Sequence, residues 1–342
     1  MTSFPKPRIV ISKCIGFEAC RYNGQMIEDN FVARLGPHVE FVGVCPEVAI
    51  GLGTPRAPIR IVSSAGRFNL IQPESGLDIT AKMLGFASDF LDGMSDIDGF
   101  ILKNRSPSCG ISDVKFYSGP QKGPVLGKTA GFFGTAVLDR FGDLAIEDEG
   151  RLNNLILREH FLTRVFVFAR FRDVRRSGSM HDLVRFQSAN KLLFMAYNQT
   201  KTRELGRIVA NAERKPIGAI LKLYEASLRE AFHKPPRLAS PINVLLHALG
   251  YFKRELTARE KRYFLGVLET YRDGRAPLSS AVGILRSWVI RFENEYLREQ
   301  TFFQPFPEEL MGMDDSGKGR EVGEVKTRDQ AGEGESRKMQ DK

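Results

Sequence analysis

The chain has 342 residues, of which 42% are hydrophobic and 27% charged. This length allows two domains, and the composition is typical of a globular protein that folds without disulfide bonds. No apolar run approaches the roughly 18 residues of a membrane helix, and the first ten residues contain no apolar signal core, so we expect a cytoplasmic protein outside any membrane.

The formal net charge of +9 comes from one region. Residues 182–303 contain 21 lysines and arginines against 12 aspartates and glutamates, which leaves 29 residues of each sign elsewhere. A concentrated positive charge is typical of a part that contacts a polyanion. Ordinary helical surfaces also carry such a surplus, so the charge alone leaves both interpretations open.

Three short apolar segments predict buried strands, and each leads into a loop that holds a cysteine. The pairs of segment and cysteine are 8–12 with Cys14, 39–44 with Cys45, and 96–103 with Cys109. Helical patterns over 76–94 and 127–142 alternate with the strands, as in a parallel α/β sheet. Because the carboxyl ends of parallel strands meet at one edge, we expect these three cysteines at one site.

The cysteines indicate metal chemistry, although four inert buried thiols are the common alternative. Soft thiolates select zinc or an iron–sulfur cluster, and the CxxC pairs typical of structural zinc are absent. Three widely spaced cysteines favour a four-iron cluster in which one iron lacks a protein ligand and can act as a Lewis acid. Cys20, deeper in the first loop, is expected beside the site or in the packing, with a fourth-ligand role as the lesser alternative.

The segments around these cysteines resemble the thiouracil desulfidase family from about residue 7 to residue 170. The matching segments are SKCIGFEACRYNG, VCPEVAIGLGTPR and KNRSPSCG. The resemblance implies a [4Fe-4S] cluster held by Cys14, Cys45 and Cys109, whose unique iron takes the sulfur of a thiolated pyrimidine without net redox change. Asn23 and Cys20 stand where the family commonly has Asp and Val, and neither change removes an implied ligand.

The same resemblance places the catalytic glutamate at Glu47 and the catalytic serine at Ser106. Replacement of C=S by C=O needs a water that is deprotonated as it attacks, and a carboxylate beside the cluster can take that proton. A hydroxyl can hold the pyrimidine edge near the iron. Without the family, a helix cap for Glu47 and a turn for Ser106 are the simpler interpretations. Lys103 and Arg105 either balance the negative charge of the cluster and the carboxylate or are simply solvated, and Lys103 is also a candidate for substrate contact. We assign Ser108 to a hydrogen bond with a cluster sulfur.

From His181 onward the apolar residues recur at helical spacing, which predicts an all-helical domain. Residues 181–306 resemble a helical domain of unknown function that is often fused to the desulfidase module. Histidines frequent in its motifs are replaced here by Asn190, Tyr197 and Arg286, which argues against a metal site. The fused arrangement resembles the tRNA 4-thiouridine desulfidases, in which the helical part is implicated in holding tRNA.

Four basic residues of this region are candidate phosphate contacts. Arg203 and Arg207 are one helical turn apart and should share a face, and Lys253 and Arg254 are adjacent. Each of them singly is more often a solvated surface residue, so the expectation concerns the basic patch as a whole.

The sequence therefore predicts an α/β fold in which a Rossmann-like parallel-sheet domain (1–172) and a linker (173–180) precede an all-helical tRNA-binding domain (181–312) and a disordered tail (313–342). The predicted function is a tRNA 4-thiouridine desulfidase with a [4Fe-4S] cluster. The acceptor of the sulfide is left open. The alternatives are a desulfidase of free thiouracil, and a non-catalytic metal-cluster sensor that binds RNA.

Overall fold

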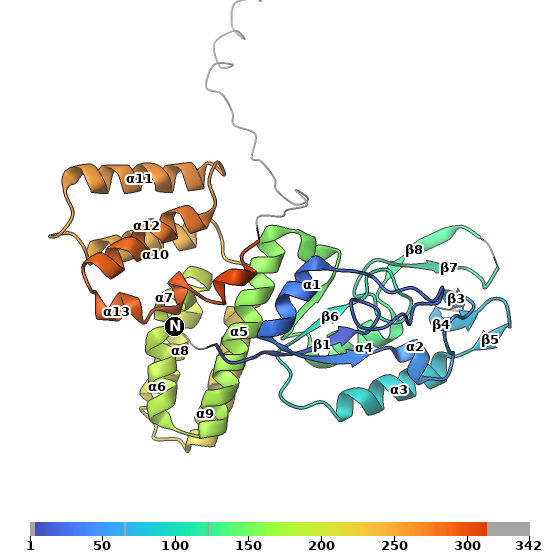
Figure 1. Cartoon of the computed structure of the whole chain (residues 1–342). Coiled ribbons are helices and arrows are strands. Elements are labelled where there is room, and N and C mark those ends of the chain that lie inside the picture. Colours follow the sequence, from blue (N-terminus) through green and yellow to red (C-terminus); the bar gives the residue numbers. More distant parts are fainter. Residues whose placement is uncertain (1–3, 65, 122, 313–342) are drawn as a thin grey trace, which may run out of the picture.

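The computed structural model describes residues 4–64, 66–121 and 123–312 (Figure 1). An α/β part with a parallel sheet comes first and a helical part follows, which confirms the predicted fold class. The tail predicted to be disordered, 313–342, lies outside the described residues.

Four parallel strands in the order β2–β1–β6–β9 form the sheet that carries the cysteines. Their bounds are β1 Arg8–Ser12, β2 Glu40–Val44, β6 Gly99–Leu102 and β9 Ala145–Asp148. The two central strands, β1 and β6, are almost entirely buried, as expected where both faces of a parallel sheet are covered. The three predicted strands are therefore present.

Helices and short 3-10 turns connect these strands. Their bounds are α1 Asn30–Leu35, η1 Gly36–His38, α2 Pro46–Ala49, α3 Thr80–Asp92, α4 Phe132–Phe141 and η2 Arg151–Asn153. The helices predicted over 76–94 and 127–142 are present as α3 and α4. Each begins later than predicted, because the residues before it pair as strands of a second sheet.

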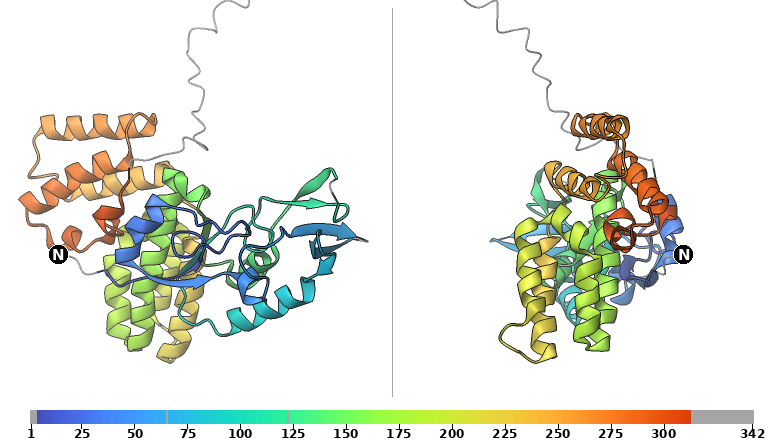
Figure 2. Two further views of the ribbon diagram at one scale, coloured as in Figure 1. Left: turned by 45° about the vertical axis from the view of Figure 1, so that its right-hand side comes forward. Right: turned by 90° about the vertical axis from the view of Figure 1, so that its left-hand side faces the viewer.

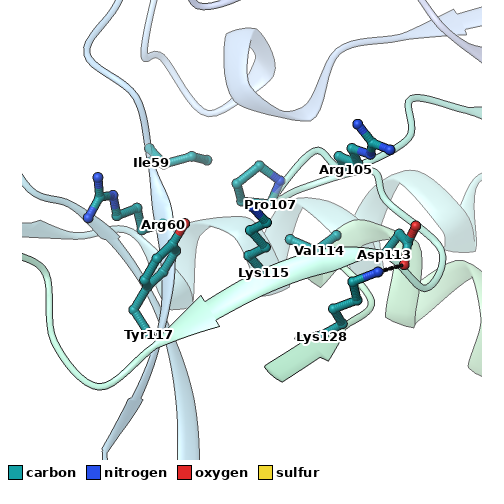
Figure 3. Close-up of a pocket in the computed structure, with 9 residues that line it drawn as sticks. All are labelled: Ile59, Arg60, Arg105, Pro107, Asp113, Val114, Lys115, Tyr117 and Lys128. Carbon is teal, nitrogen blue, oxygen red and sulfur yellow. Dashed lines mark hydrogen bonds and ion pairs between the residues drawn. The ribbon is translucent and has the colours of Figure 1, made fainter. Parts of the chain in front are cut away.

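That second sheet has the order β5–β4–β3–β7–β8 and lies at the end of the molecule away from the helical part (Figures 1 and 2). Its strands are β3 Arg60–Ser64, β4 Arg67–Gln72, β5 Leu77–Asp78, β7 Val114–Tyr117 and β8 Val125–Thr129. The strands are short and about half-exposed, so their apolar alternation is too weak to predict them. The sheet and the loop 103–110 enclose a cavity (Figure 3).

The rest of the described chain is helical, as predicted from His181 onward, and one helix, α5, precedes that residue. The elements are α5 Leu155–Ser177, α6 Met180–Ala189, α7 Lys191–Tyr197, α8 Gln199–Ala210, α9 Ile217–Ala231, α10 Ala239–Gly250, α11 Ala258–Arg272, α12 Leu278–Arg291, α13 Glu295–Arg298, η3 Thr301–Phe303 and η4 Glu308–Leu310. Among the described helices, none has the length and apolarity needed to cross a membrane.

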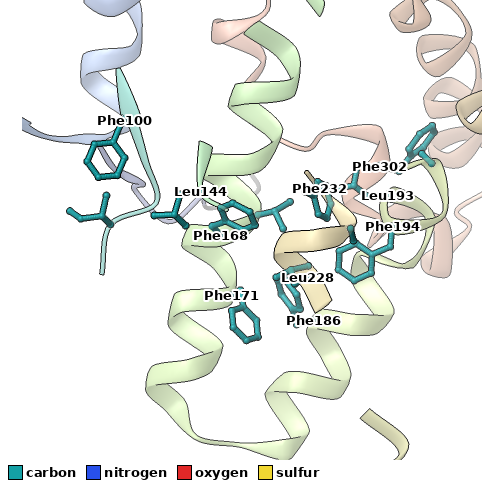
Figure 4. Packing of buried hydrophobic residues seen from close by; sticks show 14 of the residues in the cluster. Phe100, Leu144, Phe168, Phe171, Phe186, Leu193, Phe194, Leu228, Phe232 and Phe302 are labelled. Carbon is teal, nitrogen blue, oxygen red and sulfur yellow. The ribbon is translucent and has the colours of Figure 1, made fainter. Parts of the chain in front are cut away.

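Helix α5 belongs to both parts of the molecule. Its Phe161 and Val165 pack in a core with β1, and the sheet comes so close that a side chain at Gly99 would meet Val165 Cγ1 at 2.8 Å. Phe168 and Phe171 of the same helix pack in a second cluster, which contains residues of both the sheet and the helical part (Figure 4). A single helix thus joins the two cores.

The segment predicted as a linker, 173–180, is not an extended connection. Helix α5 continues through the predicted boundary to Ser177, Gly178 ends it in the left-handed conformation (φ 60°), and α6 begins at Met180. Arg175, near the end of α5, pairs with Glu225 of α9 at 3.2 Å.

Candidate functional site

The three cysteines predicted as ligands lie at the carboxyl edge of three adjacent strands. Cys14 follows β1, Cys45 follows β2 directly, and Cys109 lies in the loop after β6. Burial and then the neighbouring Cys45 raise the pKa of Cys14 to about 11. Burial raises the pKa of Cys109 as well, with Cys14 and Cys45 contributing. The structure therefore brings the three thiols within electrostatic reach of one another, as the topology predicted.

Cys20 adjoins the same site. Its side chain is 2% exposed, and its carbonyl oxygen accepts a hydrogen bond from Cys45 Sγ at 3.8 Å. Burial and then Cys45 raise the pKa of Cys20 to about 12. This thiol lies beside Cys45 and is delivered by the first loop, so the expectation that it neighbours the site is met.

Glu47 points from the first turn of α2 into this site. Its Oε1 accepts a hydrogen bond from Ser108 Oγ at 2.9 Å, and its Oε2 accepts from Arg56 Nε at 2.8 Å. Its side chain is 12% exposed. The carboxylate is therefore fixed by two side chains and does not serve as a helix cap.

Arg56 is a site residue that the sequence interpretation missed. Its Nη2 lies 2.7 Å from Glu47 Oε2, and its Nη1 donates to the carbonyl oxygens of Cys20 (3.0 Å) and Gly53 (2.8 Å). Its side chain is 4% exposed. The available signal was its place as the last residue of the matching segment VCPEVAIGLGTPR. A buried arginine needs acceptors, and here they are the carboxylate and the loop that carries Cys20.

The two serines of the loop 103–110 have different contacts. Ser106 Oγ accepts the backbone N–H groups of Ser108 (3.2 Å) and Cys109 (3.1 Å), which shapes the turn. A hydroxyl that accepts twice can still donate its own hydrogen, so Ser106 can also hold an acceptor on a substrate. Ser108 was expected to hydrogen-bond a cluster sulfur, but its hydroxyl is directed to Glu47 instead.

This loop is held on the start of α4. The N–H of Phe132 donates to Pro107 O (3.0 Å), and the N–H of Gly134 donates to Ser108 O (2.9 Å). A side chain at Gly134 would collide with the backbone oxygen of Gly110, so glycine permits this close approach. The position of Cys109 is therefore fixed by backbone contacts.

Lys103 pairs with a carboxylate. Its ammonium contacts Glu149 Oε1, and its backbone N–H donates to Ser12 Oγ at 2.9 Å. The lysine lies close enough to Cys14 to lower the pKa of that thiol, while Glu149 acts in the opposite direction. Lys103 therefore lies near the thiols with its charge compensated.

The donor set fits an iron–sulfur cluster better than a single ion. In the described ranges, no group of three or more His, Cys, Asp or Glu side chains is arranged to hold one metal ion. A cluster is bound differently, since each thiolate ligates its own iron and the sulfurs do not converge on one atom. Three thiols from three loops, with no disulfide among them, suit that arrangement.

The four candidate RNA contacts are exposed but lie on different elements. Arg203 and Arg207 share the solvent face of α8, as predicted, and neither has an ion-pair partner within the described ranges. Lys253 and Arg254 follow α10, and α7 packs against both α8 and α10. The two residues of each pair therefore lie close together, but the pair on α8 and the pair after α10 are on different helices, which both pack against α7.

The positions where the helical family commonly has histidines have ordinary structural partners. Asn190 Oδ1 accepts from Thr301 Oγ1 at 2.6 Å, the Tyr197 hydroxyl lies 3.2 Å from His160 Nδ1, and Arg286 pairs with Glu308.

Comparisons with known families divide the chain in two. Residues 9–149 match the family model described as 2-thiouracil desulfurase, and residues 191–307 match the model described as a protein of unknown function, DUF1722.

Two curated relatives and one solved structure are similar to parts of the chain. The uncharacterized protein YbbK of Bacillus subtilis (strain 168) is 32% identical over 155 residues, which cover 43% of this chain and 99% of YbbK. The uncharacterized protein YbgA of Escherichia coli (strain K12) is 26% identical over 172 residues, which cover 50% of this chain and 92% of YbgA. The solved structure is that of the [4Fe-4S]-dependent thiouracil desulfidase TudS, with 34% identity, a TM-score of 0.34, and coverage of 43% of this chain and 93% of that chain.

The fold and the site define a protein with a parallel α/β sheet, clustered thiols at its carboxyl edge and an attached helical part. By the family model and the similarity to YbbK, the chain belongs to the 2-thiouracil desulfurase family.

Proposed function

We propose that this chain removes sulfur from 4-thiouridine in tRNA, with a [4Fe-4S] cluster held by Cys14, Cys45 and Cys109. The observation that carries the proposal is the placement of these three thiols beside an immobilised carboxylate, Glu47, at one sheet edge. Membership in the 2-thiouracil desulfurase family supports the chemistry, and the name of TudS supports the cluster.

The net reaction is a hydrolysis, in which C=S and water give C=O and hydrogen sulfide without electron transfer. When bound, the cluster supplies an open iron that acts as a Lewis acid toward the sulfur. Glu47 takes the proton of the attacking water. Its Oε1 accepts only the Ser108 hydroxyl among the described residues, so this oxygen can accept a second hydrogen bond from water.

Ser106 orients the pyrimidine in this proposal. Its oxygen is fixed by two backbone N–H groups, so its remaining hydrogen has a defined direction. A fixed donor holds the ring carbon in one position relative to Glu47, which lowers the entropic part of the barrier.

The helical part supports a polynucleotide as the substrate. Its segment 182–303 carries nine more basic than acidic residues, and α5 fixes it to the domain that holds the thiols. A thiouridine stacked in tRNA must leave its stack to reach the thiols, which costs a few kcal/mol. Phosphate contacts from the basic helices offset this cost.

The test is loss of thiouridine absorbance in bulk tRNA, with the full chain reconstituted anaerobically and free 4-thiouracil assayed in parallel. We expect turnover of tRNA to fall steeply as salt rises, because salt weakens phosphate contacts, and turnover of the neutral free base to change little. Turnover of the free base alone, at every salt concentration, would replace this proposal with the free-thiouracil desulfidase.

The variant Glu47→Gln separates an enzyme from a non-catalytic sensor. We expect it to lose about 10²-fold to 10⁴-fold in turnover, the usual contribution of a general base, and to keep the cluster absorbance. Glu74→Gln, at an exposed carboxylate, is the matched control and should behave as the unmodified chain. If the unmodified chain binds the cluster and RNA but shows no turnover of either substrate, the protein is the non-catalytic sensor.

A further inference from the structure

A second, basic site lies next to the thiols. The cavity between the loop 103–110 and the second sheet has a volume of about 490 Å³ (Figure 3). Four of its lining residues are basic and one is acidic. These charged residues are Arg60, Arg105, Lys115, Lys128 and Asp113. None of the four cysteines, Glu47 or Ser108 lines it, so this cavity is distinct from the thiol site.

The positive charge of this cavity is only partly compensated. Lys128 pairs with Asp113 at 2.9 Å. Arg60 lies over the ring of Tyr117, with 4.9 Å from Cζ to the ring centroid. Arg105 and Lys115 have no ion-pair partner in the parts of the chain that the structure describes. Two cations are therefore available to an anion.

The cavity and the thiol site share a wall. Ser108 and Cys109 of the loop 103–110 are buried toward Glu47 and the thiols, while Arg105 and Pro107 of the same loop line the cavity. The side chain of Val114 on the cavity floor lies directly against Gly110. A ligand in the cavity is thus separated from the thiols by one turn of chain.

We propose that this cavity binds a backbone phosphate of RNA, next to the nucleotide whose base enters the thiol site. Basic side chains beside an aromatic ring are the combination that holds a single strand, because the cations bind phosphate and the ring stacks on a base. An acidic peptide would use the cations alone and would gain nothing from the aromatic ring of Tyr117. This inference rests on the proposed function for the identity of the neighbouring base.

The experiment measures binding of a fluorescein-labelled oligouridylate without sulfur to the full chain, by anisotropy at several salt concentrations. We expect Arg105→Gln with Lys115→Gln to weaken binding about tenfold and to lower the slope of log affinity against log salt by about 1.4, because each contact to a single strand contributes about 0.7. Arg67→Gln with Lys82→Gln removes the same charge from exposed positions outside the cavity and should bind as the unmodified chain. Equal affinity of the two double variants would overturn the inference.

Competitors identify the source of the phosphate. Displacement by unlabelled oligouridylate but not by uridine 5′-monophosphate supports a backbone phosphate. Equal displacement by the monophosphate would reassign the cavity to a free nucleotide, and equal displacement by polyglutamate would reassign it to an acidic protein. Because no probe contains sulfur, these results stand whether or not the chain desulfurates tRNA.

Discussion

Arg56 shows how one residue organises the candidate site. Its guanidinium contacts Glu47 through two nitrogens and the loop of Cys20 through the third. A planar guanidinium can satisfy these directions together, whereas the single ammonium of lysine cannot. The side chain therefore fixes the carboxylate relative to the thiols.

We predict that Arg56→Lys lowers kcat roughly 10-fold to 100-fold with little change in KM, because a misplaced carboxylate costs about that much. Steady-state kinetics on the preferred thiolated substrate measures the change. The double variant with Glu47→Gln should be no slower than Glu47→Gln alone, since Arg56 acts through that carboxylate. If the losses in kcat of the two single variants multiply in the double variant, Arg56 does not act through Glu47.

For single residues, the sequence predicts a position in the site only where the order of strands in the sheet determines it. The convergence of Cys14, Cys45 and Cys109 follows from their places after parallel strands, so it could be predicted. The contacts of Ser108 and Arg56 depend on how two loops meet in space. No local pattern indicates that the Ser108 hydroxyl faces Glu47 and not a sulfur.

Helix α5 is the element that decides the architecture. Its Phe168 lies 6.4 Å from the ring of Phe232, and its Phe171 stacks on Tyr224 at 5.4 Å. Its earlier residues pack under the sheet. If either the α/β part or the helical part unfolds alone, an apolar face of α5 becomes exposed to water, so we expect the two parts to unfold together.

We predict that Phe168→Ala lowers the free energy of unfolding by about 3–5 kcal/mol, the usual cost of a phenylalanine removed from a core. The transitions in denaturant, followed by circular dichroism and by the fluorescence of the single tryptophan, Trp288, should shift together. Phe17→Ala, at a ring that is 50% exposed, should change stability by less than about 0.5 kcal/mol. Two separate transitions would contradict a shared core.

A buried histidine on α5 makes stability depend on pH. Burial, and then Arg164 and His233, lower the pKa of His160 from 6.5 to about 3. Between pH 6.5 and about pH 3, His160 is therefore protonated in the unfolded chain and neutral in the folded chain. Stability is present above about pH 6.5 and is lost as the pH falls toward 3.

We predict a loss of up to about 1.4 kcal/mol per pH unit in that interval, since one proton is involved. His160→Gln should flatten the dependence in denaturant titrations between pH 6.5 and 4. His181→Gln, at a side chain that is 76% exposed, should leave it unchanged. If the slope of the free energy of unfolding against pH is the same in His160→Gln as in the unmodified chain, groups other than His160 cause the pH dependence.

Some helices and strands could be predicted from the sequence and others could not, because the strength of the apolar pattern depends on how each element is buried. Strands buried on both faces and helices with a clear apolar period were found from the sequence. The second sheet was missed because its strands are short and half-exposed. The end of α5 lies within the predicted linker 173–180, where Arg175 pairs with Asp96 of the α/β part and with Glu225 of α9.

For the whole molecule, the distribution of charge is the main functional signal. The α/β part and the described helices differ in charge, and the exposed face of α8 contributes two arginines without ion-pair partners in the described chain. On α11, by contrast, Arg272 pairs with Glu269 at 2.7 Å. Unpaired cations are the ones that release counterions when they bind a phosphate.

We predict that Arg203→Gln with Arg207→Gln weakens tRNA binding and lowers the salt slope by about 2, one for each lost phosphate contact. Filter binding at several salt concentrations measures both quantities. Arg272→Gln with Arg275→Gln removes equal charge from residues already paired with Glu269 and Asp273, and should have a smaller effect. An equal effect of both pairs would mean that net charge, and not the α8 face, determines affinity.

The 23 residues of α5 also set a length. At about 1.5 Å per residue the helix is roughly 35 Å long, and buried clusters of both parts pack against it. If the proposed RNA contacts both parts, α5 fixes the distance between those contacts, and selection among RNAs would then follow their three-dimensional outline more than their base sequence.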